Sequence, residues 1–503
     1  MTPTNAVTLD GRSLTLDALG AVATHGAPVL IAPDAVARMG ASRAIIEKIV
    51  ASGAAVYGVT TGFGRMSDVR IPLERLAELQ VNLVRSHVCG VGPLMPRREV
   101  RAMMLLRANV LAAGFSGARA DLAELLVGML NADLWAPVPE QGSVGASGDL
   151  APLAHLAHSL MGEGDLFHGN TRTTAAKALA AAGLKPVALQ SKEGVALING
   201  TQAHTAIGAL AVSDALVLWD TAQVAGAATL DALKGTPAAF DDRIHAARGQ
   251  VGQRHAATRL RELIEGSEIR ESHRAGDPRV QDAYSLRCMP QVHGPAWDAI
   301  KFAEGLFARE INAATDNPLV FDDGTVVSGG NFHGQVGGMA SDVLAIALTN
   351  LATISERRID RLTHPDLNEG LPPFLAHEPG LHSGYMMGQV TAAALASECK
   401  VLSHPASVDS IPTGAGKEDF VPMAMGAAIK LRRVVHNVTH VIAIELMCAA
   451  QGIEFRRPLK SSPRLEEAVK RIRAVVPALG PDRVLANDFT ALAEAVAAGK
   501  FRV

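Results

Sequence analysis

Three long segments rich in alanine, leucine and valine most strongly limit what this chain can fold into. They cover residues 203–233, 338–362 and 421–447, and apolar residues occupy most of their helical circumference. A helix that is apolar on most sides is buried by other helices. At 1.5 Å per residue each would be roughly 40 Å long. The sequence therefore predicts a mostly α-helical chain built on a long central bundle.

The composition agrees with a helical core. Hydrophobic residues make up 48% of the chain but aromatic residues only 4%, so alanine, leucine, valine and isoleucine must fill the core, and alanine and leucine favour helix. Strand signals are sparse, and the clearest is a hairpin over residues 318–327 with an Asp-Gly turn. Shorter helices are expected at 73–86, 97–113, 119–131, 174–183, 294–313, 389–402, 463–475 and 487–499.

A chain of 503 residues exceeds one ordinary domain. We expect an N-terminal part over residues 1–200, the long-helix bundle over 201–460 and C-terminal helices over 461–503. No low-complexity linker separates these parts, so one continuous unit is the alternative.

Charge and cysteine content argue against several classes of protein. The 47 basic and 50 acidic residues give a net charge of −3, which disfavours a dedicated binder of nucleic acid or of anionic membranes. The four cysteines form no C-x-x-C pair, so neither a disulfide framework nor a zinc knuckle is expected. We find no signal peptide and no stretch of about 20 residues apolar enough to span a bilayer. The expected location is the cytoplasm.

The segment Gly142–His155 is the most informative motif. It reads G-x-x-G-x-x-G, which fits neither the dinucleotide fingerprint nor the P-loop, and its serine is one position out of register for a nucleophile elbow. His155 and His158 lie on one face of a predicted helix, but no third ligand follows at a matching spacing, so no metal is expected. A glycine-rich entry into a helix is the simplest interpretation.

The tripeptide Ala146-Ser147-Gly148 also permits covalent chemistry within the backbone. Attack of the Gly148 nitrogen on the Ala146 carbonyl carbon closes a five-membered ring. Loss of one water from the ring and another from the Ser147 side chain leaves a methylidene-imidazolone, which is an electrophile. Only small residues allow so tight a turn.

The surrounding motifs resemble the aromatic amino acid ammonia-lyases and related aminomutases, in order over roughly residues 8–490. The nine matching segments are Tyr57–Gly64, Asn82–Gly92, Gly142–His155, Asn199–Gln202, Gln281–Cys288, Asp316–Pro318, Gly329–His333, His404–Pro412 and Lys417–Asp419.

This resemblance implies an elimination in which an α-amine and a β-hydrogen leave. The ring of Ala146, Ser147 and Gly148, named MIO, would form autocatalytically without an external cofactor, and Tyr57 would be the base at the β-carbon. The remaining implied residues are Asn199, Tyr284 and Glu418 in catalysis, with Gln281, Arg287 and Phe332 around the substrate. A guanidinium at Arg287 matches a substrate carboxylate bidentately.

Two positions bear on the substrate. Ser86-His87 and Glu418 resemble the family members that deaminate L-histidine to trans-urocanate, because an imidazole and a carboxylate can both bond to another imidazole. Lys417 and Phe420 depart from that pattern. Tyrosine, phenylalanine, a modified histidine or a 2,3-aminomutase reaction therefore remain alternatives, although Thr60–Gly64 differs from the aminomutase version of that loop.

The resemblance also implies a homotetramer whose bundle joins four chains, with each active site built from three of them. Fumarase and aspartase relatives, which share the long-helix architecture, carry a signature that is missing here. Neither nucleic acid nor membrane is expected as a partner.

Overall fold

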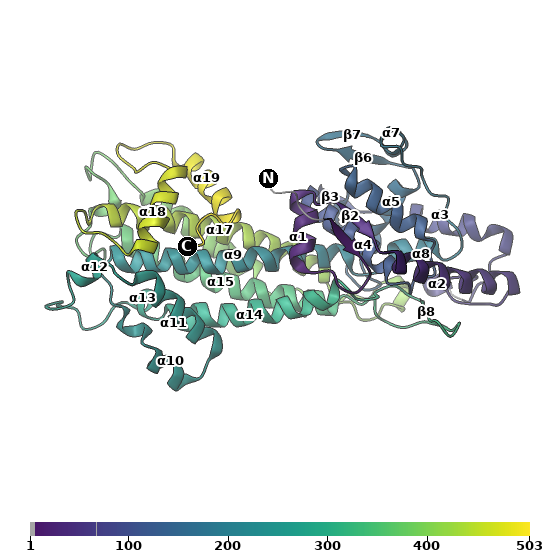
Figure 1. Ribbon diagram of the computed structural model, residues 1–503, viewed down its shortest axis with the longest axis horizontal. Helices are drawn as coiled ribbons and strands as arrows, with labels where there is room; N and C mark the ends of the chain where they lie inside the picture. The colour runs from purple at the N-terminus through teal and green to yellow at the C-terminus, as the bar shows by residue number, and fades with distance from the viewer. Residues whose placement is uncertain (1–5, 67) are drawn as a thin grey trace. The chain divides into compact units, whose positions relative to one another are not determined.

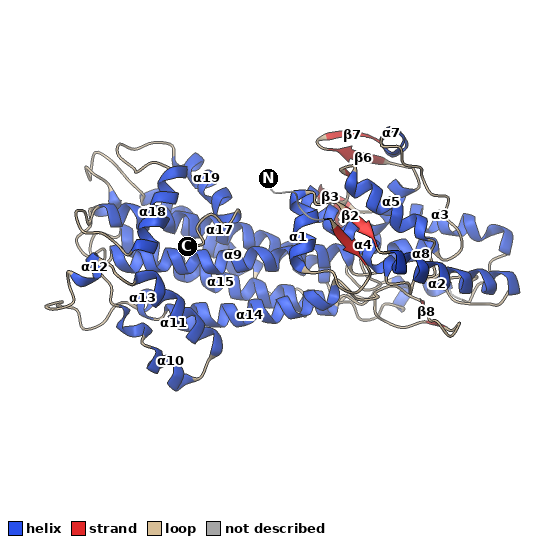
Figure 2. Cartoon of the chain, viewed as in Figure 1, coloured by secondary structure: helices blue, strands red, loops and turns tan. Residues whose placement is uncertain are grey.

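The computed structural model describes residues 6–66 and 68–503, and helices dominate it (Figures 1 and 2). The described residues divide into two compact units. Unit 1 comprises residues 1–213, 304–342 and 405–429, and unit 2 comprises 214–303, 343–404 and 430–503. The expected mostly α-helical fold is confirmed. The predicted division at residues 200 and 460 stays a prediction.

Four long helices run through both residue sets, and three of them match the predicted apolar segments. They are α9 (Gln202–Ala232), α14 (Met289–Glu310), α15 (Gln335–Thr363) and α17 (Ala424–Glu454). Helix α17 continues seven residues beyond the predicted end at residue 447, because Cys448, Ala449, Ala450 and Ile453 are buried and extend its apolar face.

One expectation about these helices is wrong. By length and composition, α9, α15 and α17 are each apolar enough to cross a membrane, because their few polar residues do not lower the mean hydropathy sufficiently. In the structure, 72%, 67% and 83% of their most apolar windows are buried inside the protein.

Unit 1 combines short helices with small sheets. Strand β1 is parallel to β2, β3 is antiparallel to β5, and β4, β6 and β7 form a three-stranded sheet. The predicted hairpin is confirmed as β8 and β9. The elements are β1 (Val7–Leu9), α1 (Leu16–His25), β2 (Val29–Ile31), α2 (Pro33–Ser52), α3 (Leu76–His87), β3 (Val91–Leu94), α4 (Arg97–Ala112), α5 (Ala120–Asn131), β4 (Leu134–Trp135), β5 (Pro139–Gln141), α6 (Leu150–Leu160), β6 (Asp165–His168), β7 (Thr171–Thr174), α7 (Ala175–Ala181), α8 (Glu193–Ile198), β8 (Leu319–Val320) and β9 (Val326–Val327).

Helix α4 forms the centre of unit 1, since every residue from Glu99 to Ala112 is buried. It packs against α1 and α5. Two arginines on this apolar helix, Arg101 and Arg107, are also buried, and both donate to main-chain carbonyls.

Unit 2 contains the remaining helices and a buried ionic network. Arg358 donates to both oxygens of Glu445, at 2.5 and 2.9 Å, and Ser355 and Thr229 donate to the same carboxylate. Burial and the neighbouring Arg358 charge hold the pKa of His293 well below its usual value. The shorter helices of this unit are α10 (Asp242–Arg248), α11 (Val251–Ile264), α12 (Glu268–Glu271), α13 (Tyr284–Arg287), α16 (Met386–Leu402), α18 (Pro463–Val475) and α19 (Leu485–Ala497).

Candidate active site

The tripeptide Ala146-Ser147-Gly148 lies in a tight turn of unit 1 between β5 and α6. Gly145, Ala146 and Gly148 make bridge contacts across the turn, and the Gly145 carbonyl accepts a hydrogen bond from the Gly334 amide at 2.9 Å. Ala146 is buried, while Ser147 is half-buried. The turn is thus held on both sides, with the serine facing accessible space.

Gly148 is packed directly against Gly200. Its φ of 73° is in the left-handed region, and a Cβ at this position would overlap the Gly200 carbonyl oxygen. The next residue, Asp149, donates its amide to the same carbonyl at 2.7 Å. Only glycine meets both the backbone angle and the close approach.

Asp149 anchors the turn to the start of α9. Its carboxylate accepts from the amides of Ala203 and His204 at 3.0 and 2.9 Å, and from the Ser143 hydroxyl at 2.9 Å. Negative charge at a helix N-terminus is favourable. Burial would raise the pKa of Asp149, but the adjacent His204 charge and these donors hold it below the usual value.

Asn199 provides a polar contact to the turn from the end of α8. Its side-chain Nδ2 donates to the Ser147 carbonyl oxygen at 2.8 Å, and the residue is only 6% exposed. A fixed amide donor at a carbonyl oxygen can stabilise negative charge that develops on that oxygen.

Glu418 approaches the serine from the distant loop that precedes α17. The Ser147 hydroxyl donates to Oε1 of Glu418 at 2.5 Å, and the Thr413 hydroxyl donates to Oε2. Thr413 and Glu418 also pair through their backbones. The carboxylate is therefore oriented by its own loop and directed at Ser147.

A cavity of about 540 Å³ opens at this point, and most of the predicted residues of unit 1 line it: Tyr57, His87, Ser147, Asn199 and Glu418. His87 is at the C-terminal end of α3, where its Nδ1 lies 2.7 Å from the Leu83 carbonyl oxygen. The Ser86 hydroxyl oxygen is 3.0 Å from the same nitrogen. A carbonyl oxygen only accepts, so a hydrogen bond to Leu83 requires a proton on Nδ1, and the tautomer with that proton has Nε2 as an acceptor. Apolar side chains such as Leu79, Leu83 and Val195 form much of the remaining wall.

A second cavity of about 650 Å³ shares Tyr57, Ser147 and Glu418 with the first. Phe332 lines it, as predicted for an aromatic wall, together with Lys417 and Phe420. The ring of Phe420 is nearly parallel to that of His333, with centroids 6.0 Å apart. The two departures from the expected motif, Lys417 and Phe420, thus line the same cavity as Ser147.

Comparison with known proteins identifies the family of the chain. The family model described as "aromatic amino acid lyase" matches residues 14–474. The chain belongs to the aromatic amino acid lyase family. A relative named histidine ammonia-lyase from Koribacter versatilis is 52% identical over 508 residues, covering 98% of both chains.

Two solved structures share the fold of this lyase. The histidine ammonia-lyase of Trypanosoma cruzi has a TM-score of 0.92 at 44% identity, covering 99% of this lyase and 94% of that chain. The tyrosine aminomutase of Streptomyces globisporus has a TM-score of 0.93 at 37% identity, with 99% and 97% covered. The overall fold is therefore common to enzymes named for different substrates.

Three of the predicted residues of this lyase lie in unit 2. Gln281 is exposed, Tyr284 is 71% exposed, and the Arg287 guanidinium lies 4.7 Å from the centroid of the Tyr284 ring. None of the three is among the residues that line the two cavities at Ser147. The residues that line the two cavities at Ser147 all belong to unit 1.

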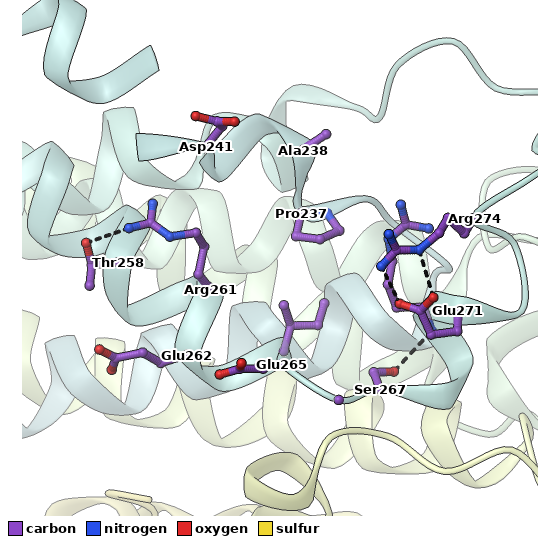
Figure 3. Close-up of a pocket in the computed structure, with 13 residues that line it drawn as sticks. Pro237, Ala238, Asp241, Thr258, Arg261, Glu262, Glu265, Ser267, Glu271 and Arg274 are labelled. Carbon is purple, nitrogen blue, oxygen red and sulfur yellow. Dashed lines mark hydrogen bonds and ion pairs between the residues drawn. The ribbon is translucent and has the colours of Figure 1, made fainter. Parts of the chain in front are cut away.

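Unit 2 of the lyase has a separate cavity of about 650 Å³ between α11 and the segment around α12 (Figure 3). Both acidic and basic side chains line it. Two of its arginines have partners: Arg274 forms an ion pair with Glu271, and Arg261 donates to the Thr258 hydroxyl. None of the predicted site residues lines this cavity, so it supplies no part of the chemistry above.

Sequence reasoning assigned no role to Asp149, Gly200, Thr413 or Arg107. The first two lie inside quoted motifs, so their position in the sequence was a usable signal. The sequence contains no signal for Thr413 or Arg107. Thr413 contacts Glu418 across a loop, and Arg107 contacts residues that are distant in the sequence.

Proposed function

We propose that this lyase is a histidine ammonia-lyase, which converts L-histidine to trans-urocanate and ammonia in the cytoplasm. The observation that supports this most directly is the shared cavity of His87, Glu418 and Ser147. The full-length relatives named histidine ammonia-lyase support the same conclusion.

The residues fit a ring formed from Ala146, Ser147 and Gly148. Gly148 has no side chain to obstruct closure, and its nitrogen lies in a turn whose ends already make bridge contacts. Closure forms a bond from the Gly148 nitrogen to the Ala146 carbonyl carbon and releases the carbonyl oxygen as water. The Ser147 hydroxyl and Cα hydrogen leave as a second water. The finished group, MIO, would supply an electrophile that makes the amine a better leaving group.

The Ser147 carbonyl oxygen is retained in this ring, and Asn199 already donates to it at 2.8 Å. Asn199 would therefore stabilise negative charge on that oxygen, at a site where burial strengthens the hydrogen bond. Tyr57 would remove the β-hydrogen, and its place in the lining of both cavities supports that role. Phe332 would contribute an aromatic wall.

His87 and Glu418 supply complementary groups for an imidazole. With Nδ1 of His87 committed to Leu83, its Nε2 accepts a substrate N–H, while a Glu418 oxygen accepts from the other nitrogen or takes its proton. A phenyl ring would offer no N–H to either side chain. Both side chains are partly buried, and a hydrogen-bonding group that a bound ligand leaves unsatisfied costs about 1–3 kcal/mol. Histidine is therefore favoured over phenylalanine.

Gln281, Tyr284 and Arg287 would complete the site from other copies of the chain in a homotetramer, with Arg287 holding the substrate carboxylate. All three residues belong to unit 2, whereas the residues that line both cavities belong to unit 1. Lys417 and Phe420 would adjust the entrance beside Ser147.

The test is to incubate the purified protein with L-histidine, without added cofactor, and to follow urocanate by its near-ultraviolet absorbance. L-tyrosine and L-phenylalanine are assayed in parallel, with product identification by mass spectrometry to reveal β-amino acids. Ser147→Ala is the control, and intact mass reports whether each protein is two waters lighter than its encoded chain.

Urocanate from the wild type alone, with the two-water deficit, would support both substrate and ring. Turnover of only tyrosine or phenylalanine would overturn the assignment to histidine, and β-amino acid products would favour an aminomutase. Activity in Ser147→Ala equal to wild type would overturn the ring chemistry.

A further inference from the structure

Arg107 is a fully buried cation directly behind the reactive turn. From α4 its Nη1 donates to the carbonyl oxygens of Ala196 and Asn199, at 2.9 and 3.1 Å, and its Nη2 donates to the side chain of Gln202. The Ala196 carbonyl belongs to the last turn of α8, where carbonyls lack a donor within the helix, and Asn199 is the residue that follows α8. The Arg107 guanidinium therefore caps the C-terminal end of α8 and holds the Asn199 peptide that follows the helix.

The end of α8 carries the two contacts on which the turn depends. Asn199 donates to the Ser147 carbonyl, and Gly200 packs against Gly148. On its other side Gly200 faces Arg107, since a Cβ at Gly200 would lie 2.6 Å from Nη2. The Gly200 peptide is thus confined between the guanidinium and the reactive tripeptide.

Other buried charged side chains lie near Arg107. Lys192 binds Asp316 at 2.8 Å, and both side chains are fully buried. Burial lowers the pKa of Arg107 to about 10, with Asp316 and Asp149 acting in the opposite direction, so the guanidinium stays charged at neutral pH. Its planar fork reaches two carbonyls and an amide together, which an ammonium group cannot do with the same geometry.

We propose that Arg107 is a positioning residue for this lyase: it holds Asn199 and Gly200 against the Ser147–Gly148 peptide, and so acts on ring formation and on turnover without touching the substrate. The proposal rests on the function proposed above for the ring. It makes Arg107 part of the machinery although the residue lies outside both cavities.

The test uses Arg107→Lys with Arg101→Lys as a matched control. Arg101 is on the same helix, is 2% exposed, and likewise donates to main-chain carbonyls, those of Val22 and Leu130. Because these hydrogen bonds and its ion pair with Asp133 are to residues outside α8, its replacement reports the general cost of altering a buried arginine. Each variant is examined by thermal unfolding, by intact mass for the two-water deficit, and by kcat and KM on L-histidine.

Both variants should unfold at lower temperature than the wild type. Arg107→Lys alone should accumulate chains at the encoded mass, and its kcat per ring-bearing chain should fall by about 10²-fold with KM unchanged, as expected for a small misplacement of a catalytic group. Complete ring formation and wild-type kcat in Arg107→Lys would overturn the proposal. Equal losses in Arg101→Lys would overturn it too, because they would reflect stability alone.

A second variant keeps the test decisive if Arg107→Lys does not fold. Gln202→Met removes the acceptor for Nη2 and should lower the same two readouts to a smaller extent. In addition, Asn199→Leu combined with the Arg107 or Gln202 change should be little worse than Asn199→Leu alone, since residues that act through one another are not additive. Full additivity would contradict the proposal. A wild type that forms the ring but makes no urocanate would refute the proposed substrate and leave the mass readout for Arg107 valid.

Discussion

The hydrogen bond from Asn199 to the Ser147 carbonyl should be worth a large part of the catalytic rate. Asn199→Leu removes the donor and keeps a side chain of similar size at a site that is 6% exposed. The bond is 2.8 Å long. Loss of one such donor at a developing oxyanion typically costs about 10²–10³ in kcat, or about 2.7–4 kcal/mol. We expect a loss in that range.

The assay is initial-rate urocanate formation over a range of L-histidine concentrations, normalised to the fraction of chains that intact mass shows to be two waters lighter. That normalisation separates failure to form the ring from slow turnover. KM should change little, because in this mechanism Asn199 contacts the turn and not the substrate.

Two results would refute the reasoning. A loss in kcat of less than about 10-fold in fully matured protein would mean that the Ser147 oxygen carries little charge in the rate-limiting step. A large increase in KM at unchanged kcat would mean that Asn199 binds the substrate directly. Asn199→Asp is the matched comparison, since a carboxylate of the same shape would repel negative charge at that oxygen.

Two further predictions concern other residues. His87→Phe should lower kcat/KM for L-histidine by the equivalent of about 1–3 kcal/mol and raise it for L-phenylalanine, because an acceptor for the imidazole is replaced by an apolar ring; parallel rates on both substrates check this, and unchanged selectivity would contradict the role given to His87. Asp231→Asn tests stability. Burial raises the pKa of Asp231 to about 6, although the hydroxyls of Ser267 and Ser461 donate to its carboxylate. The folded protein therefore loses stability as the pH rises from the ordinary carboxyl value of 3.8 through 6. The variant should therefore unfold at a higher temperature than wild type above pH 6, with the gain shrinking towards pH 4, and a constant difference across thermal scans at several pH values would contradict the assignment.

The long helices could be predicted from sequence because their apolar character extends over most of their surface. Helix α2 was missed, since its buried residues, such as Ala35, Met39 and Ile46, are separated by polar and charged ones. The sheet of β4, β6 and β7 was missed as well, because its strands have two to four residues and no alternating pattern. Short elements of this kind depend on their neighbours more than on their own residues.

The candidate site was partly readable. The glycines around Ser147 predict a tight turn of the backbone. The resemblance indicates His87 and Glu418, and both side chains line one cavity in the structure. The sequence contained no sign that Thr413 would orient Glu418 or that Arg107 would terminate α8. An arginine in an apolar helix has many possible partners, and only the folded chain selects among them.

The contact between Gly148 and Gly200 ties formation of the ring to folding of the chain. The two glycines meet only after unit 1 has folded, and dehydration of the tripeptide is not reversed when the chain unfolds. If the ring forms as proposed, its mass deficit is therefore a permanent record of folding, which denaturation does not erase. A preparation that has been unfolded and digested would still report what fraction of its chains had once reached the native turn.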